Sequence, residues 1–201
     1  MINAELPLVV SFFTNDWQYP AHGLRLEKEC QALGLDYRIE EHASRGGYIE
    51  NSCIKPFFIR KCLQEEKRPV LWVDVDGSIL KPPVFFLDLN YDFQARKINS
   101  AHRKRIWHVG TMWFNPTPET MDFVDEWCAR TGDMTDESAL DQTWKSRQWP
   151  LRTRDIPSEY FHILERNRPP LDEVVIAHRL SNGPSKQKQA PIFNRYEEII
   201  G

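Results

Sequence analysis

The 201-residue sequence has no run of 18 consecutive apolar residues, so we expect no membrane-spanning helix. Its four cysteines form no Cys-x-x-Cys pair and have no histidine nearby at the spacing of zinc ligands. This argues against a zinc site and favours reduced, partly buried thiols. A formal net charge of −3 lacks the basic excess that marks a nucleic-acid-binding domain. What remains is a chain with 41% hydrophobic residues and no internal repeat, long enough to form one globular domain.

The stretch around which the chain is organised is residues 70–83, VLWVDVDGSILKPP. Four apolar residues, Val70–Val73, predict a short strand that is buried on both faces. Asp74 and Asp76 follow it, and then a turn-forming pair at 77–78. Two like charges about 4 Å apart repel by roughly 4 kcal/mol at an effective dielectric near 20, so such a pair usually has a cation near it. Mg²⁺ and Mn²⁺ are the natural candidates, because they prefer carboxylate oxygen and substrate phosphate.

The first 80 residues alternate between strand and helix patterns. We expect strands at 8–14, 36–41 and 70–73, a polar loop at 42–52, and helices at 20–33 and 52–67, the second capped by Ser52. This β-α-β-α-β order predicts a mostly parallel sheet with helices on its faces. Ligands bind such sheets in the crevice beyond the carboxyl ends of the strands.

The second half continues the pattern less regularly. Further strands are expected at 106–115, 151–156 and 174–176, an extended segment at 91–98, and helices at 118–130 and 136–147. We predict a single domain over residues 1–180 and a polar C-terminal tail over residues 181–201.

Two families carry a strand that ends in Asp-x-Asp. Residues 70–83 resemble the metal-binding segment of glycosyltransferases with the nucleotide-sugar (GT-A) fold. They also resemble the first motif of haloacid-dehalogenase-type phosphatases, Asp-x-Asp-Gly-Thr/Ser, in which the first aspartate, here Asp74, is the nucleophile. The glycosyltransferases place a nucleotide-binding βαβα unit ahead of the motif, as this chain does. The phosphatases also need a later Gly-Asp-x-x-x-Asp stretch, which is missing after Asp76. Gly77-Ser78 departs from the small apolar pair usual in the glycosyltransferases, so the Mg²⁺-dependent phosphatase remains an alternative.

The downstream sequence resembles the small GT-A glycosyltransferase family in the same order. Residues 108–118, HVGTMWFNPTP, are similar to its Gly-Thr-x-x-Phe-Asn segment. Asp141-Gln142 is similar to its Asp-Gln acceptor-side motif, and residues 175–178, VIAH, to the terminal strand whose histidine completes the metal site. The resemblance implies an α/β, GT-A-like fold with a small antiparallel portion on the acceptor side.

The resemblance also implies roles for individual residues. Asp74, Asp76 and His178 would hold Mn²⁺ or Mg²⁺. A nucleotide-diphosphate sugar, with a UDP-sugar as first candidate, would contact Phe13, Thr14, Lys55, Asp74, Gly110 and Trp113. Asp141 is implied as general base for the acceptor hydroxyl, with Glu137 one helical turn earlier as the rival.

Six of these residues also have a structural alternative. Phe13 and Trp113 would fill the core, Lys55 would be a solvated lysine, His178 would bond the backbone, and Asp141 or Glu137 would be an acid near a helix N-terminus.

The acceptor stays open between a small molecule, a glycan and a hydroxymethylated DNA base. Local basic clusters fit a polyanionic acceptor, and they lie at His102–Arg105, Arg152 and Arg154, Arg166 and Arg168, and Lys186 and Lys188. A nucleotide-binding module without turnover and a DNA-binding protein are the non-catalytic alternatives. Because the N-terminal apolar segment lacks a basic leader, we expect a cytoplasmic protein, in a bacterium or in the host cell of a phage.

Overall fold

The structure is a computed structural model that describes residues 6–98, 106–163 and 171–178. The expected tail at 181–201 and the basic residues at 102–105, 166, 168, 186 and 188 lie outside this part of the chain. Within it, no helix has both the length and the apolar character needed to cross a bilayer.

The first half of the chain alternates strands and helices, as expected. Its elements are β1 (Leu8–Thr14), α1 (Tyr19–Ala32), β2 (Tyr37–His42), α2 (Tyr48–Ser52), α3 (Ile54–Glu66) and β3 (Val70–Val73). The second half contains β4 (Ser78–Ile79), β5 (Phe93–Lys97), β6 (Trp107–Phe114), α4 (Pro118–Arg130), α5 (Asp136–Ser146), β7 (Thr153–Asp155), β8 (His162–Ile163) and β9 (Ile176–His178). Single 3₁₀ turns, η1 (Val84–Leu87), η2 (Ser158–Tyr160) and η4 (Leu171–Glu173), join some of these elements.

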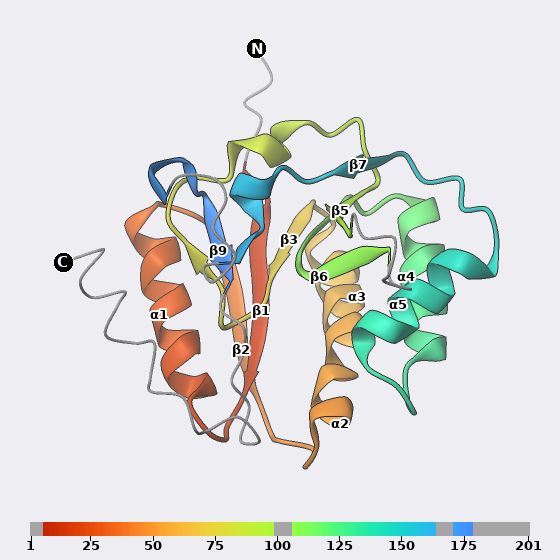
Figure 1. Cartoon of the computed structure of the whole chain (residues 1–201), viewed down its shortest axis with the longest axis horizontal. Coiled ribbons are helices and arrows are strands. Elements are labelled where there is room, and N and C mark those ends of the chain that lie inside the picture. Colours follow the sequence, from red (N-terminus) through yellow and green to blue (C-terminus); the bar gives the residue numbers. More distant parts are fainter. Residues whose placement is uncertain (1–5, 99–105, 164–170, 179–201) are drawn as a thin grey trace.

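Six strands form the central sheet in the order β2-β1-β3-β6-β5-β7 (Figure 1). The pairings of β1 with β2, β1 with β3 and β5 with β7 are parallel. Strand β6 runs antiparallel to both of its neighbours, so its direction is opposite to that of the other five strands of this sheet. A second, three-stranded sheet has the order β4-β9-β8, with β4 antiparallel to β9. The predicted mostly parallel sheet with a small antiparallel portion is confirmed.

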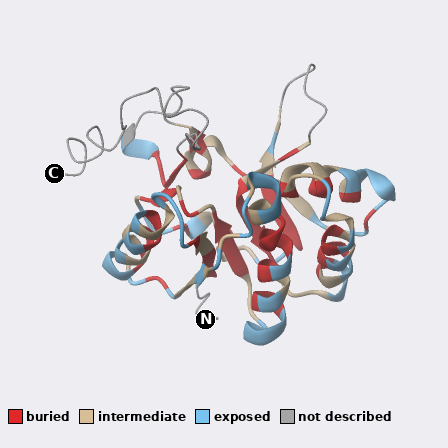
Figure 2. Cartoon of the chain, turned by 90° about the horizontal axis from the view of Figure 1, so that it is seen from below, coloured by how far each residue is buried: buried red, intermediate tan, exposed pale blue. Residues whose placement is uncertain are grey.

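Each face of the central sheet has its own core. Alternate residues of β3 point to opposite faces, as strand geometry requires: Val70 and Trp72 join the core under α3, α4 and α5, while Leu71 and Val73 join the core under α1 and the small sheet. Helices therefore cover both faces (Figure 1), and Figure 2 shows buried residues on the central strands and on the inward sides of the helices.

Two helices begin at threonine caps. The Thr117 side chain accepts a hydrogen bond from the Thr120 amide at the start of α4, and Thr135 does the same for the Ser138 amide at the start of α5. The second cap fixes the position of Asp136, the first residue of α5.

The loop expected at 42–52 is wrong in its second half, where α2 forms. Ser52 does not cap α3, because its hydroxyl donates to the carbonyl of Ile49 and accepts from the amide of Asp136. Cys53 occupies the N-cap position without a side-chain hydrogen bond. A five-residue helix has too short a pattern to stand out in the sequence.

Candidate functional site

Asp74 and Asp76 follow directly after the carboxyl end of β3. The Asp74 amide donates to the carbonyl of Gly110 on β6 at 2.8 Å, and the amide of Gly77 turns back to the Asp74 carbonyl at 2.7 Å. The loop is held from α1, since Arg25 Nη2 donates to the carbonyls of Val75 (3.2 Å) and Gly77 (2.7 Å). The backbone that carries both aspartates is thus fixed from two sides.

The Asp74 carboxylate is oriented by two donors on the same oxygen. Trp72 Nε1 donates to Oδ1 at 2.8 Å, and Lys55 Nζ pairs with the same oxygen at 2.8 Å. Within the residues that the structure describes, no hydrogen bond or ion pair reaches the second oxygen, Oδ2. Oδ2 is therefore the oxygen available to a ligand.

Lys55 lies between two carboxylates. Its side chain is 8% exposed, and Nζ stands 2.6 Å from Oδ2 of Asp136, whose side chain is 4% exposed. Burial alone would lower the pKa of Lys55, but the negative charges of Asp136 and Asp74 outweigh it and raise the pKa above its ordinary value. Lys55 is therefore a charged, buried residue and not the solvated lysine of the structural alternative.

Asp76 is placed where its charge is unfavourable. Burial, followed by the charge of Asp74, raises the pKa of Asp76 to about 7, although Arg25 and Lys55 act in the opposite direction. A carboxyl group that resists ionisation beside a second carboxylate needs a proton or a cation to stabilise it. The Asp74 and Asp76 pair therefore fits a divalent cation.

His178, on β9, packs over the glycines of the site. A Cβ on Gly77 would stand 3.1 Å from the His178 ring, and a Cβ on Gly110 would stand 3.1 Å from its Nδ1 and 2.8 Å from the Phe161 ring. Burial lowers the pKa of His178 to about 4, so the ring is neutral at physiological pH. Its Nε2 is 2.6 Å from the hydroxyl oxygen of Thr111. Coordination of a metal through Nε2 would require this hydrogen bond to break.

The three expected metal ligands come from the same region, but they do not form a closed site. In the described ranges, no three His, Cys, Asp or Glu side chains are grouped so as to hold a metal ion. The two aspartates fit the cation better than His178 does. The charge of Asp76 is unfavourable, and Asp74 has one oxygen, Oδ2, without a partner among the described residues.

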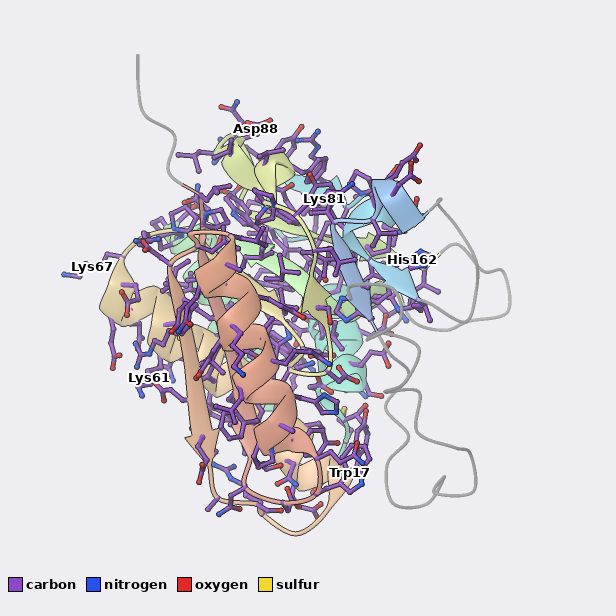
Figure 3. All side chains as sticks on the ribbon, turned by 90° about the vertical axis from the view of Figure 1, so that its left-hand side faces the viewer. Trp17, Lys61, Lys67, Lys81, Asp88 and His162 are labelled. Carbon is purple, nitrogen blue, oxygen red and sulfur yellow. The ribbon has the colours of Figure 1, made fainter. Side chains whose placement is uncertain are left out.

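Aromatic residues surround the carboxyl end of β1. The rings of Trp17 and Tyr19 pack edge to face with their centroids 5.1 Å apart. Trp17 has a backbone φ of 55°, a conformation that is rare for a bulky residue. Figure 3 shows Trp17 at the lower end of the molecule, where α1 begins, and Asp88 at the opposite end. Tyr48, at the start of α2, is 71% exposed, yet loss of water around its hydroxyl and the charge of Asp136 raise its pKa.

The remaining donor-site residues take different positions. Thr14 is buried at the end of β1, and its hydroxyl helps to lower the pKa of Asp16. Phe13 packs on α1, because a Cβ on Gly23 would stand 2.5 Å from its ring. Trp113 is completely buried in the core, so its ring offers no surface for a sugar. The structural alternative is the better description of Trp113.

The two candidate bases lie on α5 and are not equivalent. Oδ1 of Asp141 accepts a hydrogen bond from the amide of Ile106 at 2.9 Å, and Oδ2 pairs with Lys145. Glu137 follows directly after Asp136, on the first turn of the helix. Of the acids on α5, Asp136 is the one paired with Lys55 at the Asp74 site. Its only signal in the sequence is its position as the first helical residue after a threonine cap.

The described basic clusters are engaged by the protein itself. Arg152 forms a two-pronged pair with the buried Asp92, through Nε at 2.9 Å and Nη2 at 2.7 Å. The Arg154 guanidinium lies 3.9 Å from the centre of the Phe85 ring and 3.5 Å from an oxygen of Asp88. These contacts fix the edge of the sheet at β7, so they give no support to a polyanion site there.

Comparison with known proteins gives no match to a protein-family model and no match to a curated protein sequence. Solved structures do match. A glycosyltransferase involved in the glycosylation of the major capsid of PBCV-1 is 12% identical, with a TM-score of 0.69, and the match covers 96% of this chain and 99% of that one. The galactosyltransferase LgtC, in complex with donor and acceptor sugar analogues, is 12% identical with a TM-score of 0.56, covering 96% and 94%. The glycosyltransferase GlyE of Streptococcus pneumoniae TIGR4 is 12% identical with a TM-score of 0.54, covering 96% of this chain and 60% of its own. The chain therefore has the fold of GT-A glycosyltransferases.

Proposed function

We propose that this chain is a metal-dependent glycosyltransferase that moves a sugar from a nucleotide-diphosphate sugar to an acceptor hydroxyl. The observation that carries the proposal is the Asp74 and Asp76 pair at the carboxyl end of β3. In the described part of the chain, Oδ2 of Asp74 has no hydrogen-bond or ion-pair partner, and the pKa of Asp76 is raised. The likeness in fold to three glycosyltransferases supports the same reaction class.

Mn²⁺ or Mg²⁺ would be held by Asp74 and Asp76, with His178 as a third ligand if its bond to Thr111 opens. When bound, the ion supplies Lewis-acid stabilisation of the diphosphate leaving group. In the reaction, the bond between the anomeric carbon and the diphosphate oxygen breaks, and a bond from that carbon to the acceptor oxygen forms. The acceptor proton leaves during this exchange, and Asp141, or else Glu137, is our proposed general base if the reaction inverts the anomeric centre.

The donor nucleotide would lie beyond the ends of β1 and β3. Thr14 ends β1, and the rings of Trp17, Tyr19 and Tyr48 stand near the same edge, where flat aromatic surfaces suit a nucleobase. A UDP-sugar is our first donor candidate. The strained backbone of Trp17 supports a functional position, since such conformations gather at ligand sites.

The acceptor is proposed only as a class: a glycan, a small molecule or a hydroxymethylated DNA base. The four cysteines are all free and buried, which supports the cytoplasmic location proposed for the reaction.

A thermal-shift screen tests this proposal. Nucleoside diphosphates and nucleotide sugars are each added with and without Mn²⁺. A ligand at 100 times its Kd stabilises the native state by about 2.7 kcal/mol, which shifts Tm by roughly 5–11 °C for a chain of this size. A shift with one nucleotide that requires Mn²⁺ supports the proposal. A shift only with Mg²⁺ and a phosphate mimic would instead favour a phosphatase with Asp74 as nucleophile, and a metal-independent shift with DNA would favour a DNA-binding protein.

A further inference from the structure

A buried cation links three elements directly behind the proposed metal ligands. Lys55 comes from the first turn of α3, Asp74 from the end of β3 and Asp136 from the first turn of α5. Nζ of Lys55 lies 2.8 Å from Asp74 Oδ1 and 2.6 Å from Asp136 Oδ2. The three residues therefore form a row of alternating charges that runs from the buried Asp136 through Lys55 to the partly exposed Asp74.

The amino group of Lys55 has its bonding capacity filled. An ammonium group has three hydrogens, and Nζ has three oxygen partners: Asp74 Oδ1, Asp136 Oδ2 and the carbonyl of Val109 at 3.4 Å. The face of the Trp72 ring covers it further, 5.2 Å from Nζ to the ring centre. A diphosphate has no free N–H of Lys55 to bind in this arrangement.

Asp136 is itself firmly placed. Its amide donates to the Ser52 hydroxyl, and its carbonyl accepts from Trp127 Nε1 at 2.9 Å. Its carboxylate lies in the first turn of α5, where the helix dipole favours negative charge. Asp136 is thus a fixed anion that holds the long Lys55 side chain in one conformation.

The consequence falls on Asp74. With Oδ1 held by Lys55 and Trp72, the carboxylate cannot rotate freely, and Oδ2 is the oxygen without a protein partner among the described residues. Groups that bond to a metal ligand without touching the metal orient that ligand and tune the affinity of the site for the metal.

We propose that Lys55 and Asp136 are positioning residues that orient Asp74 for a divalent cation, and that Lys55 is not a ligand of the donor diphosphate. This inference rests on the proposed function above, and it replaces the role that the sequence suggested for Lys55.

The test measures the affinity for Mn²⁺ alone, by electron paramagnetic resonance, in folded variants. Asp136→Asn removes the anion that holds Lys55. The double variant Lys55→Met with Asp136→Leu removes the ion pair without changing the local net charge, and it guards against misfolding because apolar replacement of a buried pair is often neutral for stability. Asp125→Asn is the matched control, since Asp125 forms an ion pair with Arg60 of the same helix α3 on the surface.

We expect Asp136→Asn and the double variant each to weaken Mn²⁺ binding by about 10- to 100-fold, while Asp125→Asn changes it by less than about twofold. UDP affinity measured in EDTA should be unaffected by the double variant. Wild-type Mn²⁺ affinity in the double variant, or a loss of metal-free UDP binding in it, would overturn the inference and leave the proposed function standing. A wild-type chain that binds neither Mn²⁺ nor any nucleotide would overturn both.

Discussion

Removing the Lys55 amino group should destabilise this protein far more than removing a cation from its surface. Lys55→Met keeps the length and the apolar stem of the side chain but leaves Asp74 and Asp136 facing one another without a counter-charge. The two oxygens that now contact Nζ are 2.8 and 2.6 Å from it, so they would lie close together once it is gone. One of the two carboxylates must then take up a proton, or the site must open.

The magnitude follows from the burial of the pair. Breaking a buried ion pair by removing one partner costs about 3–5 kcal/mol. For a chain of this size, each kcal/mol shifts Tm by about 2–4 °C, so Tm should fall by roughly 6–20 °C. Arg60→Met provides the contrast, because Arg60 and Asp125 are 39% and 49% exposed and such surface pairs contribute about 0.2–1 kcal/mol.

The assay is urea unfolding at pH 7.5 in EDTA, followed by tryptophan fluorescence and circular dichroism. Lys55→Met should lose several times more unfolding free energy than Arg60→Met, and adding Asp136→Leu should restore most of the loss. If Lys55→Met loses no more than Arg60→Met, the Lys55 ion pairs do not exist in solution and the account of the site is wrong.

Three further substitutions test separate parts of the structure. Gly110→Ala places a Cβ 2.8 Å from the Phe161 ring, so we expect a loss of about 1–3 kcal/mol in urea unfolding; an unchanged stability would show that the ring is not packed there. Trp17→Ala should weaken UDP binding by about 10- to 100-fold in fluorescence titration without lowering Tm, if the base stacks on this ring; unchanged affinity would place the base elsewhere. Arg152 holds the pKa of Asp92 below its ordinary value. The ionised Asp92 carboxylate therefore stabilises the fold above about pH 4, and this stabilisation is lost as the pH falls through the folded-state pKa. Asp92→Asn should therefore flatten the fall in Tm between pH 5 and pH 3, and an unaltered acid profile would contradict this pairing.

The local sequence signals located the elements that carry strong patterns. The strand at 8–14 and the strand at 70–73 form as predicted, because runs of buried β-branched and aromatic residues leave little choice of structure. The helix at 118–130 also forms over the predicted residues, with Thr117 as its cap and proline at its start. The strands of the small sheet were harder to predict from the sequence. They have only two or three residues, and β4 pairs with β9 about a hundred positions further along the chain, so periodicity gives almost no signal.

The site was only partly predictable for a related reason. Asp74 and Asp76 stand out because two acids follow a buried strand. Asp136 does not stand out, because its role comes from a contact between α5 and α3 that no local pattern encodes. A lysine at the start of a helix is typical of a phosphate-binding residue. Only the tertiary structure shows that the Lys55 amino group is already paired with Asp74 and Asp136.

Release of a nucleoside diphosphate from a nucleotide sugar, in the presence of Mn²⁺, tests the central claim most directly. The wild-type chain is compared with Asp76→Asn over a panel of donors, with inorganic phosphate measured alongside. Because the pKa of Asp76 is raised to about 7, ionising this carboxyl costs stability of the metal-free fold as the pH rises from about 4 to about 7. Asp76→Asn should therefore be at least as stable as the wild type at pH 8. We expect metal-dependent release from one donor, abolished by Asp76→Asn in a folded protein. Equal release by the wild type and Asp76→Asn, or release of inorganic phosphate alone, would contradict it.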